Sequence, residues 1–136
     1  MDYFVEAFGG FDPCHDKDAA LKFCLDIMMA DHRLGELERL LSTDDFFGGV
    51  EGEPGWIIER RSDDRHPGYE SWPVNARFRA YVEPDSYLLT YPEFFSDRIT
   101  FARYVQAIVS VYKRRHPENQ TRLQRIEAYI QTASTI

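Results

Sequence analysis

Hydrophobic residues recur every three or four positions over residues 16–41, and this spacing predicts an amphipathic α-helix. Its apolar face is formed by Ala20, Phe23, Ile27, Ala30, Leu34, Leu37 and Leu41. Asp16 or Asp18 can cap the start of the helix, because either carboxylate can accept from the first free backbone N–H groups. Gly35 is unfavourable inside a helix, so we predict a break near His32 that leaves two helices.

The same spacing predicts two consecutive helices near the C-terminus. Thr100 is a suitable cap for the first of them. Its apolar face comprises Phe101, Tyr104, Val105, Ile108, Val111 and Tyr112. The cationic run 113–116 suits the negative end of the helix dipole, and Pro117 then stops this helix and opens the last one, which is expected to reach about Thr132. The last helix is predicted to bury Leu123, Ile126, Ile130 and Ala133.

Alternation of hydrophobic and polar residues predicts strands in the middle of the chain. Residues 77–82 alternate strictly, and residues 83–86 have the composition of a turn. Residues 87–91 are therefore predicted to return as the second strand of a hairpin with a four-residue connection. Residues 56–61 form a further β-prone run, and the aromatic-rich residues 3–8 read as a short opening strand.

Two segments rich in Gly, Pro and Asp, residues 42–55 and 62–73, are predicted to be surface loops. The fold class that follows is α+β: an antiparallel sheet with a helix from the N-terminal half and two C-terminal helices packed against it. Residues 1–136 are expected to form a single domain, because a chain of this length buries one core. Hydrophobic residues make up 43% of the chain and aromatic residues 15%, which excludes a disordered chain.

The charges are unevenly distributed along the chain. Residues 1–59 contain 14 Asp or Glu and 4 Lys or Arg, whereas residues 60–136 contain 9 and 12, so the net charge of −7 divides into −10 and +3. An acidic surface steers a basic partner toward it during association. The pattern favours a basic protein partner and argues against direct binding of nucleic acid.

Sequence motifs of the common enzyme classes are absent. The chain has no G-x-S-x-G, no P-loop, no G-x-G-x-x-G and no H-E-x-x-H. Cys14, His15, Cys24 and His32 are metal-ligand types, but none is paired with another at the spacing of a zinc site. We therefore expect no enzymatic activity, no metal and no cofactor.

The chain also has no basic leader at its N-terminus and no run of about 18 apolar residues. We expect a cytoplasmic protein that does not enter a membrane. Two cysteines, Cys14 and Cys24, are expected to be reduced in such a compartment.

Two other functions stay open at this stage. A small hydrolase could combine carboxylates with a histidine such as His15 or His66. An RNA-binding module could stack bases and bind phosphates on one strand face. The residues of that face would be Arg60, Arg61, Arg77, Arg79, Trp72 and Tyr81. The negative net charge argues against RNA, because such modules usually have a dominant basic surface.

The loop of residues 42–55 combines carboxylates with aromatic side chains, as protein interfaces often do. We predict that it binds a partner, with the aromatic residues as anchors and the carboxylates paired to the partner's cations. The predicted partner-binding residues are Asp44, Asp45, Phe46, Phe47, Glu51, Glu53 and Trp56. The alternative is a solvated loop in which Phe46 and Phe47 turn inward.

Three segments carry a family resemblance: S-Y-L-L-T-Y-P-E-F-F at 86–95, I-T-F-A-R-Y at 99–104 and Y-K-R-R-H-P-E at 112–118. An early helix over 20–41 followed by F-F-G-G at 46–49 extends it. With these features the chain resembles the immunity proteins of bacterial contact-dependent growth inhibition (CDI) that neutralise ribonuclease toxins.

The resemblance implies a function that agrees with the charge pattern. A member of this family binds the C-terminal nuclease domain of its cognate toxin inside the cell that produces both, and occludes the active site or the substrate-binding surface. This inhibition needs no catalytic residue and no cofactor. The resemblance leaves open which toxin is bound, whether the active site or an exosite is covered, and whether the chain is a monomer or a weak dimer.

Overall fold

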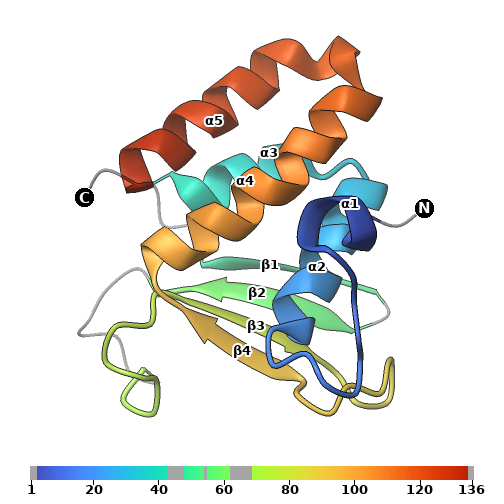
Figure 1. Cartoon of the computed structure of the whole chain (residues 1–136). Coiled ribbons are helices and arrows are strands. Elements are labelled where there is room, and N and C mark those ends of the chain that lie inside the picture. Colours follow the sequence, from blue (N-terminus) through green and yellow to red (C-terminus); the bar gives the residue numbers. More distant parts are fainter. Residues whose placement is uncertain (1–2, 43–47, 54, 62–68, 135–136) are drawn as a thin grey trace.

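The computed structural model describes residues 3–42, 48–53, 55–61 and 69–134 (Figure 1). The helices are α1 (Phe4–Phe8), α2 (Ala19–Ala30), α3 (Leu34–Leu41), α4 (Arg98–Arg115), a 3₁₀ turn (Pro117–Asn119) and α5 (Gln120–Ser134). The strands are β1 (Gly49–Gly52), β2 (Trp56–Arg60), β3 (Phe78–Val82) and β4 (Glu93–Ser96). None of the helices in these ranges combines the length and apolar character that crossing a bilayer requires.

The four strands form one antiparallel sheet in the order β1-β2-β3-β4, so each strand pairs with its neighbour in sequence. The helices gather on one side of the sheet, with α4 and α5 packed against each other above it (Figure 1). This arrangement confirms the α+β prediction. It also leaves the other side of the sheet without a helix among the described residues.

Helix α2 lies between the sheet and the other helices, and it is buried on nearly all sides. Its first seven residues, 19–25, are all buried, including Lys22. The spacing rule was right for Ala20 and Phe23, but Ile27 is half-buried and Ala30 is exposed. The rule also missed Leu21, Cys24, Leu25, Met28 and Met29, which are almost fully buried. A helix packed between a sheet and other helices buries side chains on several faces, so the single apolar stripe of an amphipathic helix does not include all of its buried residues.

The predicted break near His32 is confirmed, although its cause is different. His32 has a φ of 56°, and the N–H groups of His32 and Arg33 donate back to Met29 O and Met28 O at 3.0 and 2.8 Å, which closes the end of α2. Gly35 lies inside α3, where a Cβ would come within 2.4 Å of the Arg122 guanidinium. Gly35 therefore lies against the end of the Arg122 side chain and does not end a helix.

Two predictions in the N-terminal half are wrong. The opening segment is helix α1, closed by Gly9 and Gly10, whose N–H groups donate to Val5 O and Phe4 O at 3.0 Å. Gly9 has a φ of 76°, the left-handed conformation that ends helices and that glycine adopts without strain. The predicted loop 42–55 contains strand β1, which its two glycines and single valine concealed.

The predicted hairpin is correct in its first strand and in its turn, but its second strand is wrong. Ser86 N donates to Glu83 O, so the turn at 83–86 forms as predicted. The returning strand is nevertheless β4 at 93–96, which makes the connection ten residues long, from 83 to 92. The predicted second strand, 87–91, is part of that connection.

The two C-terminal helices, α4 and α5, lie close to the positions predicted from the hydrophobic spacing. Helix α4 is capped by Asp97, whose carboxylate accepts from Thr100 N at 2.7 Å, so Thr100 is the third helical residue and not the cap. The helix ends at Arg115 as predicted, and Pro117 opens a 3₁₀ turn that continues into α5. Leu123, Ile126, Ile130 and Ala133 are all buried, as predicted.

Candidate partner-binding face

The side of the sheet that lacks helices carries a mixed row of carboxylates, an arginine and half-buried apolar side chains. We call it the open face. Its residues are Glu51, Ile57, Glu59, Arg79, Tyr81, Glu93 and Phe95. Strand alternation explains the set, because the intervening residues of β2 and β3, such as Ile58 and Ala80, point into the core.

Strand register places these side chains in two rows across the sheet. Glu51 pairs with Ile57, Ile57 with Tyr81, and Tyr81 with Glu93. In the next row Glu59 pairs with Arg79, and Arg79 with Phe95. Directly opposed residues lie close enough for their side chains to interact.

A hollow of about 500 Å³ lies over the end of the open face nearest the β1–β2 turn. It is lined by Glu51, Gly52, Glu53, Gly55, Trp56, Ile57, Glu59, Arg79, Tyr81 and Glu83. Four of these residues are glutamates and one is an arginine, so the hollow is strongly acidic. Its floor includes apolar and aromatic groups, which gives it the mixed character of a protein interface.

Arg79 is held firmly on the open face. Its Nη1 donates to Glu59 at 2.5 Å and its Nε to Glu93 at 2.6 Å, while its guanidinium lies 4.7 Å from the centre of the Tyr81 ring. Burial opposes the charge on Arg79, but hydrogen bonds to Glu93 and Glu59 outweigh this effect and raise its pKa. Its charge is therefore neutralised within the chain.

Three other glutamates of the hollow keep their negative charge available. Glu51, Glu53 and Glu83 are exposed, and among the residues that the structure describes no cationic side chain pairs with their carboxylates. Within the same described ranges, no three Asp, Glu, His or Cys side chains lie close enough to hold one metal ion.

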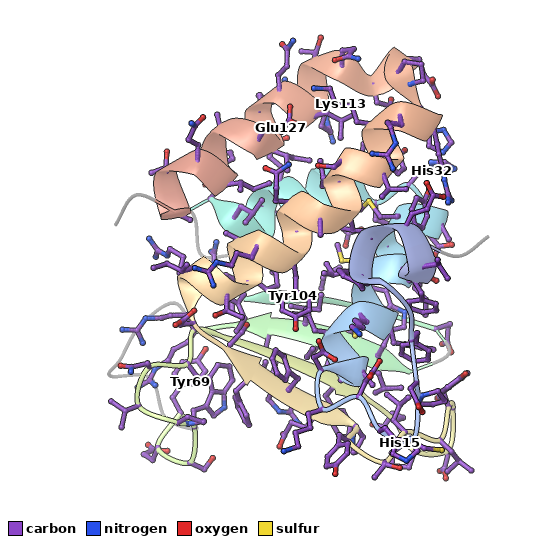
Figure 2. All side chains as sticks on the ribbon, viewed as in Figure 1. His15, His32, Tyr69, Tyr104, Lys113 and Glu127 are labelled. Carbon is purple, nitrogen blue, oxygen red and sulfur yellow. The ribbon has the colours of Figure 1, made fainter. Side chains whose placement is uncertain are left out.

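The opposite end of the open face is covered by aromatic side chains. The Trp72 ring packs 5.2 Å from Phe95, Tyr69 packs 5.0 Å from Trp72, and the Arg61 guanidinium lies 5.2 Å from the Tyr69 ring. Tyr69 lies at the edge of the molecule far from His15 (Figure 2). Among the described residues, this cover leaves the acidic end as the accessible part of the face.

The residues proposed for an RNA-binding face are only partly brought together: Arg79 contacts Tyr81 on the open face, and Trp72 packs on Phe95 at its opposite end. The Arg60 side chain points to the helical side, is buried, and donates to the carbonyl groups of Arg39, Leu40 and Ser42. Arg79 is paired with two glutamates, as described above. The described part of this strand face is therefore acidic where it is open, which is unfavourable for a phosphate backbone.

The seven predicted partner-binding residues have different placements. Asp44, Asp45, Phe46 and Phe47 lie outside the described residues. Glu51 and Glu53 are exposed at the hollow, but Trp56 is only 2% exposed. Its Nε1 donates to Glu53 O at 3.1 Å and the Arg33 guanidinium lies 5.1 Å from its ring, so Trp56 supports the β1–β2 turn from below.

Sequence reasoning missed Glu59, Tyr81 and Glu83 as members of this site. They come from two strands and the turn after β3, and only the β1–β2–β3 register places them beside Glu51 and Glu53. Their alternation with apolar residues indicated a solvent-exposed strand face. The alternation did not indicate which strands would pair.

None of the described histidines lines the hollow, and the rings of His32 and His116 pack 5.0 Å apart. His15 is exposed and pairs with Asp12 at 2.9 Å, whereas His32 shares a 2.7 Å hydrogen bond with the Tyr112 hydroxyl at the other end of the molecule (Figure 2). Hydrogen bonds from the Cys14 N–H and from His15 lower the pKa of Asp12. The carboxylate–histidine pair of the hydrolase hypothesis is therefore not found at the hollow among the described residues. His66 lies outside the described residues.

Comparison with known proteins adds no relative: no family model, no curated protein and no solved structure matches this chain. Functional inference therefore depends on the sequence pattern and on the open face.

Proposed function

We propose that this chain is an immunity protein that binds a cognate ribonuclease-type toxin domain of a contact-dependent inhibition system and neutralises it by occlusion. The observation that carries the proposal is the accessible acidic end of the open face, with Glu51, Glu53 and Glu83 unpaired among the described residues. The resemblance of three C-terminal segments to this family supports the same function.

The chemistry of the proposed partner fits this surface. A ribonuclease binds a polyanion and so presents Lys and Arg side chains along its substrate path. An inhibitor that offers carboxylates in place of phosphates competes for those cations, and the complementary charges also accelerate association. Half-buried Ile57 and Tyr81 supply apolar contact between the glutamates of the open face. In protein interfaces most of the binding energy comes from a few such central residues.

Inhibition by occlusion requires nothing catalytic from this chain. The inhibitor has to bury enough of the toxin surface to exclude RNA, for which a total contact of more than about 1,000 Å² is typical. A sheet face is suited to that task, because its backbone is fixed by ladder hydrogen bonds and changes little on binding.

Co-expression with a toxin tests the proposal. The gene immediately upstream is expected to encode a large secreted protein with a nuclease-like C-terminal domain. That domain should arrest growth and cleave RNA when expressed alone. Co-expression of this chain should restore growth, and this chain should co-purify with the toxin domain. A toxin domain from an unrelated system is the control. Absence of both rescue and a complex with the upstream domain would refute the function.

A further inference from the structure

We infer that the connection between β3 and β4, residues 83–92, carries an apolar anchor by which this chain holds a cationic protein partner. The anchor consists of three exposed apolar side chains: Leu88 is 81% exposed, Tyr87 41% and Tyr91 39%. The inference rests on the proposed function, because the toxin domain is the partner it names. It assigns to that partner a contact surface beyond the open face.

The connection is fixed to the rest of the fold, so the anchor is held at the surface. Tyr87 N donates to Glu83 O at 3.2 Å, within the turn that follows β3. Thr90 N donates to Pro13 O at 2.9 Å, which ties the connection to the N-terminal half of the chain. Leu89 is buried and belongs to the core. A connection that is already ordered loses little conformational entropy when a partner binds.

Aromatic rings continue the apolar surface from the connection to α1. The Tyr87 ring lies 6.3 Å from the half-buried Phe11 ring, and Phe11 stacks on Phe4 at 4.2 Å. Val5, the next residue of α1, is 71% exposed. Single exposed apolar residues are ordinary on protein surfaces, but several in one place mark an interaction site. Tyrosine is also enriched in the interfaces of protein complexes.

The charges of the connection indicate a cationic partner. Its charged residues are Glu83 and Asp85, which are both exposed, and neither carboxylate pairs with a cation among the described residues. Glu83 also lines the hollow, so the connection adjoins the acidic end of the open face. A protein surface with Lys or Arg around an apolar side chain is complementary to this arrangement.

The same charges disfavour the other occupants of an exposed apolar surface. A second copy of the chain would bring together two molecules that each carry a net charge of −7. A bilayer with anionic lipids would repel Glu83 and Asp85 before Leu88 could insert. A cationic protein meets neither obstacle.

A matched pair of variants tests the anchor with the toxin domain. Leu88→Ser removes an exposed aliphatic side chain from the anchor, and Val74→Ser removes one that is 88% exposed and precedes the opposite end of β3. We expect Leu88→Ser to weaken binding of the toxin domain at least about fivefold and Val74→Ser to change it less than about twofold. Thermal unfolding checks that both variants fold.

A titration without the toxin tests the chemistry of the surface. The ¹⁵N-labelled chain is titrated with an amphipathic peptide of leucine and lysine, and with two control peptides, one of serine and lysine and one of leucine and glutamate. We expect saturable shifts at the amides of Leu88, Thr90 and Tyr91 with the leucine–lysine peptide only. Shifts that are absent, that map to another surface, or that are equal for a control peptide would overturn the inference.

The outcomes separate this inference from the proposed function. Equal binding of the toxin domain by both serine variants would overturn the anchor and leave the immunity function standing. Peptide shifts at the connection without any toxin complex would support the surface chemistry and refute the immunity function. Dimerisation or binding to anionic vesicles that Leu88→Ser abolishes would assign the surface to a second copy or to a membrane, and would overturn the inference.

Discussion

At the scale of single residues, the close approach of β1 and β2 depends on Gly49. A Cβ at this position would lie 2.6 Å from the Ile58 carbonyl oxygen and 3.1 Å from Glu59 Cα, both of them backbone atoms that cannot move aside. Gly48, one residue earlier, has open space around its Cβ position. The two glycines therefore offer a matched test of the strand pairing.

We predict that Gly49→Ala destabilises the protein by about 1–3 kcal/mol, because the backbone of β1 must shift away from β2. Gly48→Ala should change the free energy of unfolding by less than about 1 kcal/mol. Urea unfolding followed by circular dichroism measures both. A Gly49 variant as stable as the Gly48 variant would contradict the β1–β2 register.

A second residue that joins distant parts of the chain is Tyr104. Its hydroxyl donates to the Asp18 carboxylate, and Lys22 lies 3.5 Å from the same group. Burial, together with the hydrogen bond to Asp18, raises the pKa of Tyr104. The hydroxyl thus remains a donor throughout the physiological range and ties α4 to the start of α2 (Figure 2).

We predict that Tyr104→Phe lowers the free energy of unfolding by about 1–2 kcal/mol, since it removes a hydrogen bond to a charged acceptor and leaves the ring in place. Tyr91→Phe, at a partly exposed tyrosine outside the core, should cost less than about 0.5 kcal/mol. Equal costs in thermal or urea unfolding would show that the Asp18 contact contributes nothing.

At the scale of elements, the cap of α4 links helix stability to pH. Backbone and side-chain hydrogen bonds from Thr100 lower the pKa of Asp97 below its ordinary value of 3.8. A carboxylate with a lower pKa in the folded chain than in the unfolded chain stabilises the fold above that ordinary value. The contribution is lost as the pH falls through the lowered pKa.

We predict that Asp97→Ala costs about 1 kcal/mol at pH 7, whereas Asp97→Asn, which keeps an accepting oxygen, costs less. The advantage of the native chain over the Asn variant should shrink at about pH 3 and below, because only the native cap is titrated there. Urea unfolding at both pH values measures the difference. A difference that does not change with pH would rule out the Asp97 carboxylate as the charged cap.

The elements also show what a single sequence can predict. The positions of α2 to α5 followed from hydrophobic spacing and from the Pro and cationic signals between α4 and α5, all of which are local. The predicted caps did not form, because Asp18 makes no side-chain cap and Asp97, not Thr100, caps α4. Strand β1 was missed because two glycines and one glutamate among four residues carry no strand signal. Its pairing with β2 comes from tertiary contacts, which override local preference.

The candidate site was only partly predictable for the same reason. Glu51 and Glu53 stood out because they lie close together in an acidic segment. Glu59, Tyr81 and Glu83 join them only through the β1–β2–β3 register, and the burial of Trp56 follows from the helices above the sheet. Contacts between segments that are distant in sequence cannot be predicted from the spacing or the composition of either segment.

At the scale of the whole molecule, folding pairs some carboxylates of the acidic N-terminal half, those of Glu6, Glu38 and Glu59, with arginines of the basic C-terminal half. Glu6 pairs with Arg114 and Arg115, and Glu38 lies 3.0 Å from Arg125. Lys113 and Glu127 add a pair between α4 and α5 (Figure 2). The uneven charge along the sequence therefore serves partly to join the two halves, and the hollow carries part of what remains unpaired.

This unpaired negative charge should control the rate of association with the partner. We predict that Asp44→Lys with Glu51→Lys slows association with the toxin domain by about tenfold at low salt and flattens the dependence of the association rate on ionic strength. Asp31→Lys with Glu118→Lys makes the same change in net charge at exposed sites away from the hollow. This control should slow association much less, because steering depends on the local potential at the docking surface.

Stopped-flow mixing at several salt concentrations distinguishes a local effect from a global one. If the two variants slow association equally, net charge alone attracts the partner and the acidic end of the open face has no special part. If neither variant changes the rate, the interface lies on another surface. Slowing confined to the first variant, with dissociation also faster, would mean that the same carboxylates both steer the toxin and hold it.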